Sequence, residues 1–60
     1  MQADSNNFNH VVLYNPGQYV TDQEKFFIQR TDAEKWARDY GKAHPMARVR
    51  IFTRGEYERG

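Results

Sequence analysis

Residues 31–45, TDAEKWARDYGKAHP, decide the fold because they contain the clearest helical pattern in the chain. The apolar residues of this stretch recur at i, i+3, i+4 and i+7, so a helix would carry them in a single stripe. The stripe consists of Ala33, Trp36, Ala37 and Tyr40. At this spacing, beside two alanines, the two large rings are expected to pack in a core rather than to bind a ligand.

The same stretch also contains signals for the two ends of the helix. TDAE (31–34) matches a capping box, in which the Thr31 hydroxyl accepts from the Glu34 amide and the Glu34 carboxylate accepts from the Thr31 amide. The C-terminal end is predicted either at Gly41 or at Ala43, and Pro45 prevents the helix from continuing.

Three short runs outside the helix are rich in β-branched and aromatic residues, which is typical of strands. They are HVVLY (His10–Tyr14), KFFIQR (Lys25–Arg30) and RVRIFTR (Arg48–Arg54). The first run stops at NPGQ (15–18), where Pro16 and Gly17 are typical of the two central positions of a type II turn, the second of which has a positive φ.

The order of these elements is strand, strand, helix, strand. A right-handed crossover through the helix can place the third strand beside the first. We therefore predict an α+β fold: a three-stranded antiparallel sheet of order 2-1-3 with one helix packed on one face (β-β-α-β). Sixty residues allow a single domain, 1–60. Residues 1–8 are polar and rich in asparagine, and we expect them to be flexible.

Alternation along the strands assigns side chains to the two faces of the sheet. The helix is expected to cover the face that carries Val11, Leu13, Phe26, Ile28, Val49 and Ile51. The opposite face would then carry Val12, Tyr14, Phe27, Phe52 and the arginines. An apolar face that one helix leaves uncovered is typical of an interface.

The strand RVRIFTR is the candidate site, because it places three arginines on one side. Aromatic residues and arginine are enriched in the energetically dominant positions of protein interfaces, which predicts a partner-binding surface. Its expected residues are Tyr14, Phe27, Arg48, Arg50, Phe52 and Arg54. Two other interpretations stay open: a nucleic-acid surface of guanidinium groups and rings, or a solvated sheet face whose arginines pair with Asp22, Glu24 or Glu56.

Several functional classes fit the sequence poorly. There are no cysteines, and His10 and His44 lack neighbouring ligands at metal-binding spacing, so we expect no metal. No serine, cysteine or acid is placed to make either histidine a catalytic base, and a body of this size has little room for a substrate pocket. The four glycines are scattered and form no phosphate-binding loop. We therefore expect neither enzymatic activity nor a cofactor.

The charge distribution and hydropathy of the chain bear on its expected location in the cell. Residues 1–41 contain four Lys/Arg and six Asp/Glu, a net charge of −2, whereas residues 42–60 contain five Lys/Arg and two Asp/Glu, a net charge of +3. The mean hydropathy is −1.02, and no apolar run approaches the roughly 20 residues of a membrane span. The first nine residues also lack the basic and apolar regions of a secretory signal. We expect a cytoplasmic location and no membrane partner.

Residues 24–54, EKFFIQRTDAEKWARDYGKAHPMARVRIFTR, resemble a pattern found in short proteins of bacteriophages and mobile elements. In that pattern a strand ends in Thr-Asp or Ser-Glu, a helix carries Ala-Glu-x-Trp-Ala, and a strand follows after Pro or Gly. The layout is similar to that of small phage inhibitors of host RNA polymerase. The resemblance implies a small protein that binds a host macromolecule and changes its activity. This chain departs from the acidic members of that group, since its net charge is +1.

The leading functional hypothesis is therefore a small non-enzymatic protein of phage or mobile-element origin that binds and modulates a host protein. The alternative is a nucleic-acid-binding module that uses Arg48, Arg50, Phe52 and Arg54. A third hypothesis is a homodimer without a foreign partner. In the first case the contact would be made by the arginine and aromatic face of the sheet or by the outer surface of the helix, and in the second case by these four residues.

Overall fold

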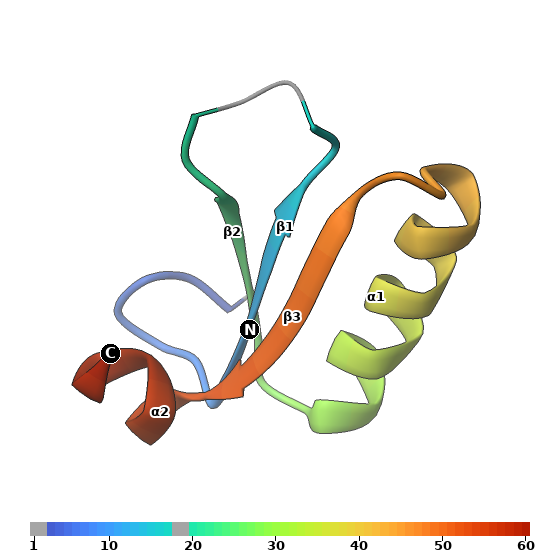
Figure 1. Cartoon of the computed structure of the whole chain (residues 1–60). Helices are drawn as coiled ribbons and strands as arrows, with labels where there is room; N and C mark the ends of the chain where they lie inside the picture. Colours follow the sequence, from blue (N-terminus) through green and yellow to red (C-terminus); the bar gives the residue numbers. More distant parts are fainter. Residues whose placement is uncertain (1–2, 18–19) are drawn as a thin grey trace.

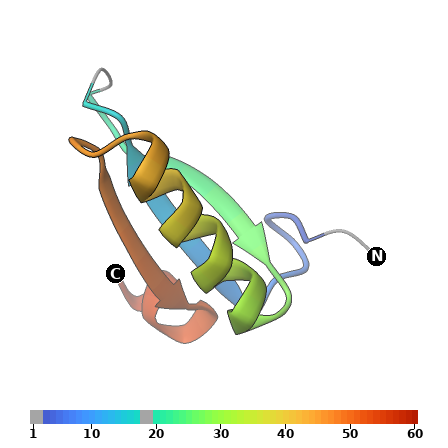
Figure 2. The same cartoon turned by 90° about the vertical axis from the view of Figure 1, so that its right-hand side faces the viewer.

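The computed structural model describes residues 3–17 and 20–60. The chain forms a three-stranded antiparallel sheet of order β2-β1-β3 with a helix on one face, as predicted (Figure 1). The elements in chain order are β1 (His10–Asn15), β2 (Gln23–Phe27), α1 (Arg30–Ala43), β3 (Arg48–Thr53) and α2 (Arg54–Arg59). Figure 2 shows α1 in front of the sheet and α2 behind it. Both edges of the sheet are therefore formed by strands that pair on one side only.

The start of α1 differs from the prediction. Its N-cap is Gln29, which makes no side-chain cap hydrogen bond, and the Gln29 carbonyl accepts from the Ala33 amide at 3.2 Å. The Glu34 carboxylate pairs instead with Arg30 Nε at 3.0 Å, one helical turn away. The predicted capping box at Thr31 is therefore wrong, because the helix begins before Thr31.

The C-terminal end of α1 and the turn after β1 agree with the prediction, whereas the second strand is shifted. Of the two ends considered for α1, the later one is observed: Gly41 lies inside the helix, which ends at Ala43. Gly17 has a positive φ of 102°, as the expected turn requires. The second strand is displaced from the predicted Lys25–Arg30 to Gln23–Phe27, because α1 already begins at Arg30.

A second capping box begins a helix that we did not predict. The residues TRGE (53–56) repeat the Thr-x-x-Glu pattern, and here Thr53 Oγ1 accepts from the Glu56 amide at 3.2 Å. The Glu56 carboxylate accepts from the Thr53 amide at 2.9 Å. These two hydrogen bonds begin α2.

The two faces of the sheet are assigned by its register. Val12 lies opposite Ile51 and Tyr14 lies opposite Val49, so these four side chains share a face. The Tyr14 ring packs against Trp36 and Tyr40 of α1, with centroid distances of 4.8 and 5.0 Å.

β1 and β2 therefore turn toward α1 the side chains that were predicted for the opposite face, whereas β3 is oriented as predicted. Phe27 also lies on the α1 face, with its ring 6.2 Å from that of Trp36, whereas Val11 and Leu13 lie on the other face, opposite Phe52 and Arg50. Alternation could not orient β1, because Val11 and Val12 are both fully buried and both faces are therefore covered.

Phe8 closes the second face of the sheet. Its side chain, at the end of the segment expected to be flexible, is only 3% exposed. Its ring lies 4.8 Å from that of Phe26 and 5.7 Å from that of Tyr57 in α2. Phe8, which precedes the first strand, and Tyr57, from the last helix, therefore meet on the face of the sheet opposite α1.

Candidate functional site

The sheet face opposite α1 carries the candidate site, and we call it the arginine face. Strand register arranges its side chains in rows across β2, β1 and β3. The central row consists of Glu24, Leu13 and Arg50, and Phe52 and Arg48 lie on β3 on either side of Arg50. This row lies beyond the part of the face that Phe8 covers, so Arg48 and Arg50 keep 74% and 67% of their side chains exposed.

Asp22 lies between the two exposed arginines. One of its carboxylate oxygens is 3.6 Å from Arg48 Nη2 and the other is 3.7 Å from Arg50 Nη2. Asp22 is positioned by Asn15, a fully buried residue whose side-chain amide donates to Asp22 Oδ1 at 3.3 Å and to the Thr21 carbonyl at 3.4 Å. The pairing with Asp22 is among those expected for a solvated sheet face.

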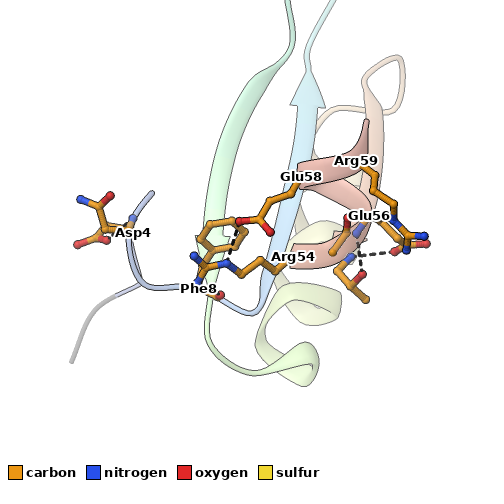
Figure 3. Close-up of polar contacts among 9 residues, drawn as sticks. Asp4, Phe8, Arg54, Glu56, Glu58 and Arg59 are labelled. Carbon is orange, nitrogen blue, oxygen red and sulfur yellow. Dashed lines mark hydrogen bonds and ion pairs between the residues drawn. The ribbon is translucent and has the colours of Figure 1, made fainter.

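Arg54 does not belong to this arginine row. It is the first residue of α2, and its guanidinium lies 4.9 Å from the Phe8 ring centroid. It also donates to the Phe8 carbonyl at 3.4 Å and pairs with Glu58 at 3.2 Å (Figure 3). Arg54 thus connects the N-terminal segment to α2.

An apolar notch lies between α2 and the centre of the arginine face. It encloses about 350 Å³ and is lined by Leu13, Arg50, Phe52, Glu56, Tyr57 and Gly60. The Arg50 guanidinium lies 5.5 Å from the Phe52 ring centroid at its margin. Sequence reasoning missed Leu13 and Tyr57. The Thr-x-x-Glu pattern at 53–56 was the signal that could have identified α2, and with it Tyr57.

Two groups at the notch have shifted pKa values. The pKa of Glu56 is lowered, chiefly because its carboxylate accepts the Thr53 backbone amide at the start of α2. The pKa of Tyr57 is raised, chiefly because its hydroxyl donates to the Glu24 carboxylate across the sheet. Both shifts result from hydrogen bonds that hold α2 in place.

The structure brings together only part of the predicted site. Arg48, Arg50 and Phe52 lie on one face, whereas Tyr14 and Phe27 lie beneath α1 on the opposite face. Their predicted place on the arginine face is wrong, because the register turns them toward Trp36. Within residues 3–17 and 20–60, no group of three or more histidine, aspartate or glutamate side chains could hold a metal ion.

Comparison of the chain with protein-family models, curated proteins and solved structures found no match. No helix in the part of the chain that the structure describes is long and apolar enough to cross a membrane.

Proposed function

We propose that this chain is a small non-enzymatic protein that binds a protein partner through the arginine face. The observation that carries the proposal is an apolar notch, with Leu13 and Phe52 in its lining, next to two exposed arginines. An apolar centre with arginine at its margin is the composition of energetically dominant interface residues. The resemblance to phage proteins supports a host protein as that partner and modulation of its activity as the outcome.

The charge of the arginine face favours a protein over a nucleic acid. Its charged residues Asp22, Glu24, Arg48 and Arg50 comprise two acids and two bases, so they provide no net positive charge. Affinity for nucleic acid depends mainly on cations that neutralise phosphates. A mixed patch instead suits a protein surface, where paired charges determine specificity and orientation.

The test is affinity capture from bacterial lysate, with and without nuclease, using the wild-type chain and the Arg50→Glu variant. We expect a stoichiometric protein that survives nuclease and is lost with Arg50→Glu, since the new carboxylate would lie beside Asp22. Arg38→Glu makes the same charge change on an exposed residue of α1 and should leave capture unchanged. Capture that both variants retain equally would refute the proposal.

Nucleic acid is the second candidate, because Arg48 and Arg50 are largely exposed and Phe52 lies beside Arg50. Two phosphate contacts with a single strand would weaken the affinity about sevenfold between 50 and 200 mM salt. Titration of a labelled oligonucleotide at both salt concentrations measures this change. Loss of every captured partner on nuclease treatment, together with that salt dependence, would favour this candidate over a protein.

A further inference from the structure

A second surface lies along the outer edge of β2. The strand order leaves β2 without a partner on that side, and Figure 2 shows it at the margin of the sheet beside the N-terminal segment. A groove of about 750 Å³ lies at the C-terminal part of this edge and extends past the end of β2. It is lined by residues of the N-terminal segment and by Lys25, Phe26, Phe27, Ile28, Gln29 and Asp32. Consecutive residues from both faces of the strand line the groove, so it runs along the edge rather than over one face.

Two residues of opposite charge line this groove. Lys25 lies within β2, and Asp32 lies in the first turn of α1 beyond the end of the strand. Within the described residues neither forms an ion pair, whereas Arg48, Arg50 and Arg54 all do. The β2 edge therefore presents charges that the chain itself does not neutralise.

The groove also has an aromatic wall. The Lys25 ammonium lies 6.0 Å from the Phe27 ring centroid and 5.6 Å from that of Trp36. The lining on this side thus includes the Lys25 cation and the Phe27 ring, and Asp32 follows beyond the end of the strand. An added strand presents every second side chain to one face, at intervals of roughly 7 Å.

We propose that the β2 edge binds an extended peptide segment of a partner protein by strand addition. Antiparallel addition is the more stable geometry per residue, and it places the N-terminal part of the segment near Asp32. The side chains on the α1 side would then follow the order base, apolar residue, acid at alternate positions. The base would face Asp32, the apolar residue Phe27 and the acid Lys25. Backbone pairing would provide affinity and the side chains specificity.

A second copy of the chain fits this edge less well. Antiparallel pairing of two β2 strands with full overlap is centred on Lys25, the middle residue of Gln23–Phe27. The two Lys25 side chains would then lie directly opposite each other, and like charges in that position are destabilising. A peptide with an acid at that position would instead pair with Lys25.

The first test uses fluorescein-labelled heptapeptides and fluorescence anisotropy with the full chain. The matched probe is Thr-Lys-Thr-Val-Thr-Glu-Thr, and the controls carry lysine at both charged positions or glutamate at both. We expect the matched peptide to bind at least tenfold more tightly than either control. Equal affinities, or no binding of any of the three, would overturn the proposal.

Reversal of the charge at Lys25 tests whether the peptide binds along this groove. With Lys25→Glu the preferred probe should become the peptide with two lysines, because both charged residues of the groove are then acidic. Lys35→Glu makes the same charge change on an exposed residue of α1 and should keep the preference for the matched peptide. If Lys25→Glu leaves the preference unchanged, the peptide does not lie along this groove. Arg50→Glu should not affect this binding, so the result is independent of the arginine face.

Methylated probes test the strand addition itself. Two forms of the matched peptide carry one N-methyl group, either on the valine amide or on the following threonine amide. Neighbouring amides of a strand point to opposite edges, so one form should lose at least tenfold in affinity and the other should not. Equal effects of the two methyl groups would mean that side chains alone make the contact, and would refute strand addition. Dimerisation in place of peptide binding, seen by sedimentation, would also refute it.

Discussion

The two faces of the sheet are closed by different means. On one face a helix of 14 residues contributes Trp36 and Tyr40, whose rings stack on each other and both contact the Tyr14 ring. On the other face a helix of six residues contributes Tyr57, and Phe8 comes from a segment that precedes the first strand. The α1 face is therefore built largely by one regular element. The arginine face depends on residues that precede the first strand and follow the last one, and Arg48 and Arg50 on it remain exposed.

Removal of the Phe8 ring should have the largest effect on stability. Phe8 is 3% exposed and contacts Phe26, Tyr57 and Arg54. Loss of a buried phenylalanine ring typically costs about 3–5 kcal/mol, and a domain of this length has roughly 3–9 kcal/mol in total. We expect Phe8→Ala to lower the free energy of unfolding by about 3–5 kcal/mol, a large share of the total, as measured by urea denaturation with circular dichroism.

Phe27→Ala is the matched control on the α1 face. Its ring is only half-buried, so we expect less than half the loss in free energy of unfolding caused by Phe8→Ala. Comparable losses would mean that the two faces of the sheet contribute equally to the free energy of unfolding. A loss below about 1 kcal/mol for Phe8→Ala would mean that the N-terminal segment does not close the arginine face in solution.

The two Thr-x-x-Glu motifs provide a smaller and more discriminating comparison. Thr53 caps α2, whereas Thr31 lies inside α1 and is exposed. Replacing a capping threonine with alanine costs about 1 kcal/mol. Thr53→Ala should therefore lower the free energy of unfolding by that amount, and Thr31→Ala should change it little. Urea denaturation of both variants measures the difference, and the opposite ranking would show that the sequence-based capping box at Thr31 forms after all.

The sequence predicted the order of the first four elements because each has a local pattern, and the right-handed crossover through the helix then placed the third strand beside the first. Residues 31–43 have a helical repeat, and residues 48–53 alternate. The sheet faces could not be predicted in the same way. Val11 and Val12 are adjacent and both fully buried, so the pattern of β1 is the same whichever face α1 covers. The long-range packing of Tyr14 on α1 and of Phe8 on Phe26 determines the choice.

The candidate site was predicted only in part for a related reason. Arg48, Arg50 and Phe52 share a face because all three lie on one alternating strand. Their acidic partner, Asp22, comes from the segment before β2 and is placed by the buried Asn15. Alternation within a single strand cannot predict a contact between strands, and six residues of α2 contain too little periodicity to predict a helix.

The smallest expected effect is a loss of folding stability at high pH, when Tyr57 on the arginine-face side of the sheet ionises. The Glu24 carboxylate accepts a hydrogen bond from Tyr57, which raises the tyrosine pKa above its ordinary value of 10.0 in the folded chain. The folded form therefore holds this proton more tightly than the unfolded form. The resulting stabilisation is fully present below pH 10 and is lost as the pH rises through the raised pKa.

Tyr57→Phe tests this linkage because it removes the hydroxyl and keeps the ring that packs on Phe8. We expect the variant to be slightly less stable than the wild type at neutral pH and to show a smaller loss of stability above pH 10. Glu24→Gln keeps an acceptor but removes its charge, so Tyr57 should titrate at lower pH than in the wild type, as followed by the difference in tyrosinate absorbance between the two chains. An unchanged titration in Glu24→Gln would mean that Tyr57 does not bond to Glu24 in solution. The link between α2 and the β2 side of the arginine face would then be absent, and the apolar notch would be wider than the structure indicates.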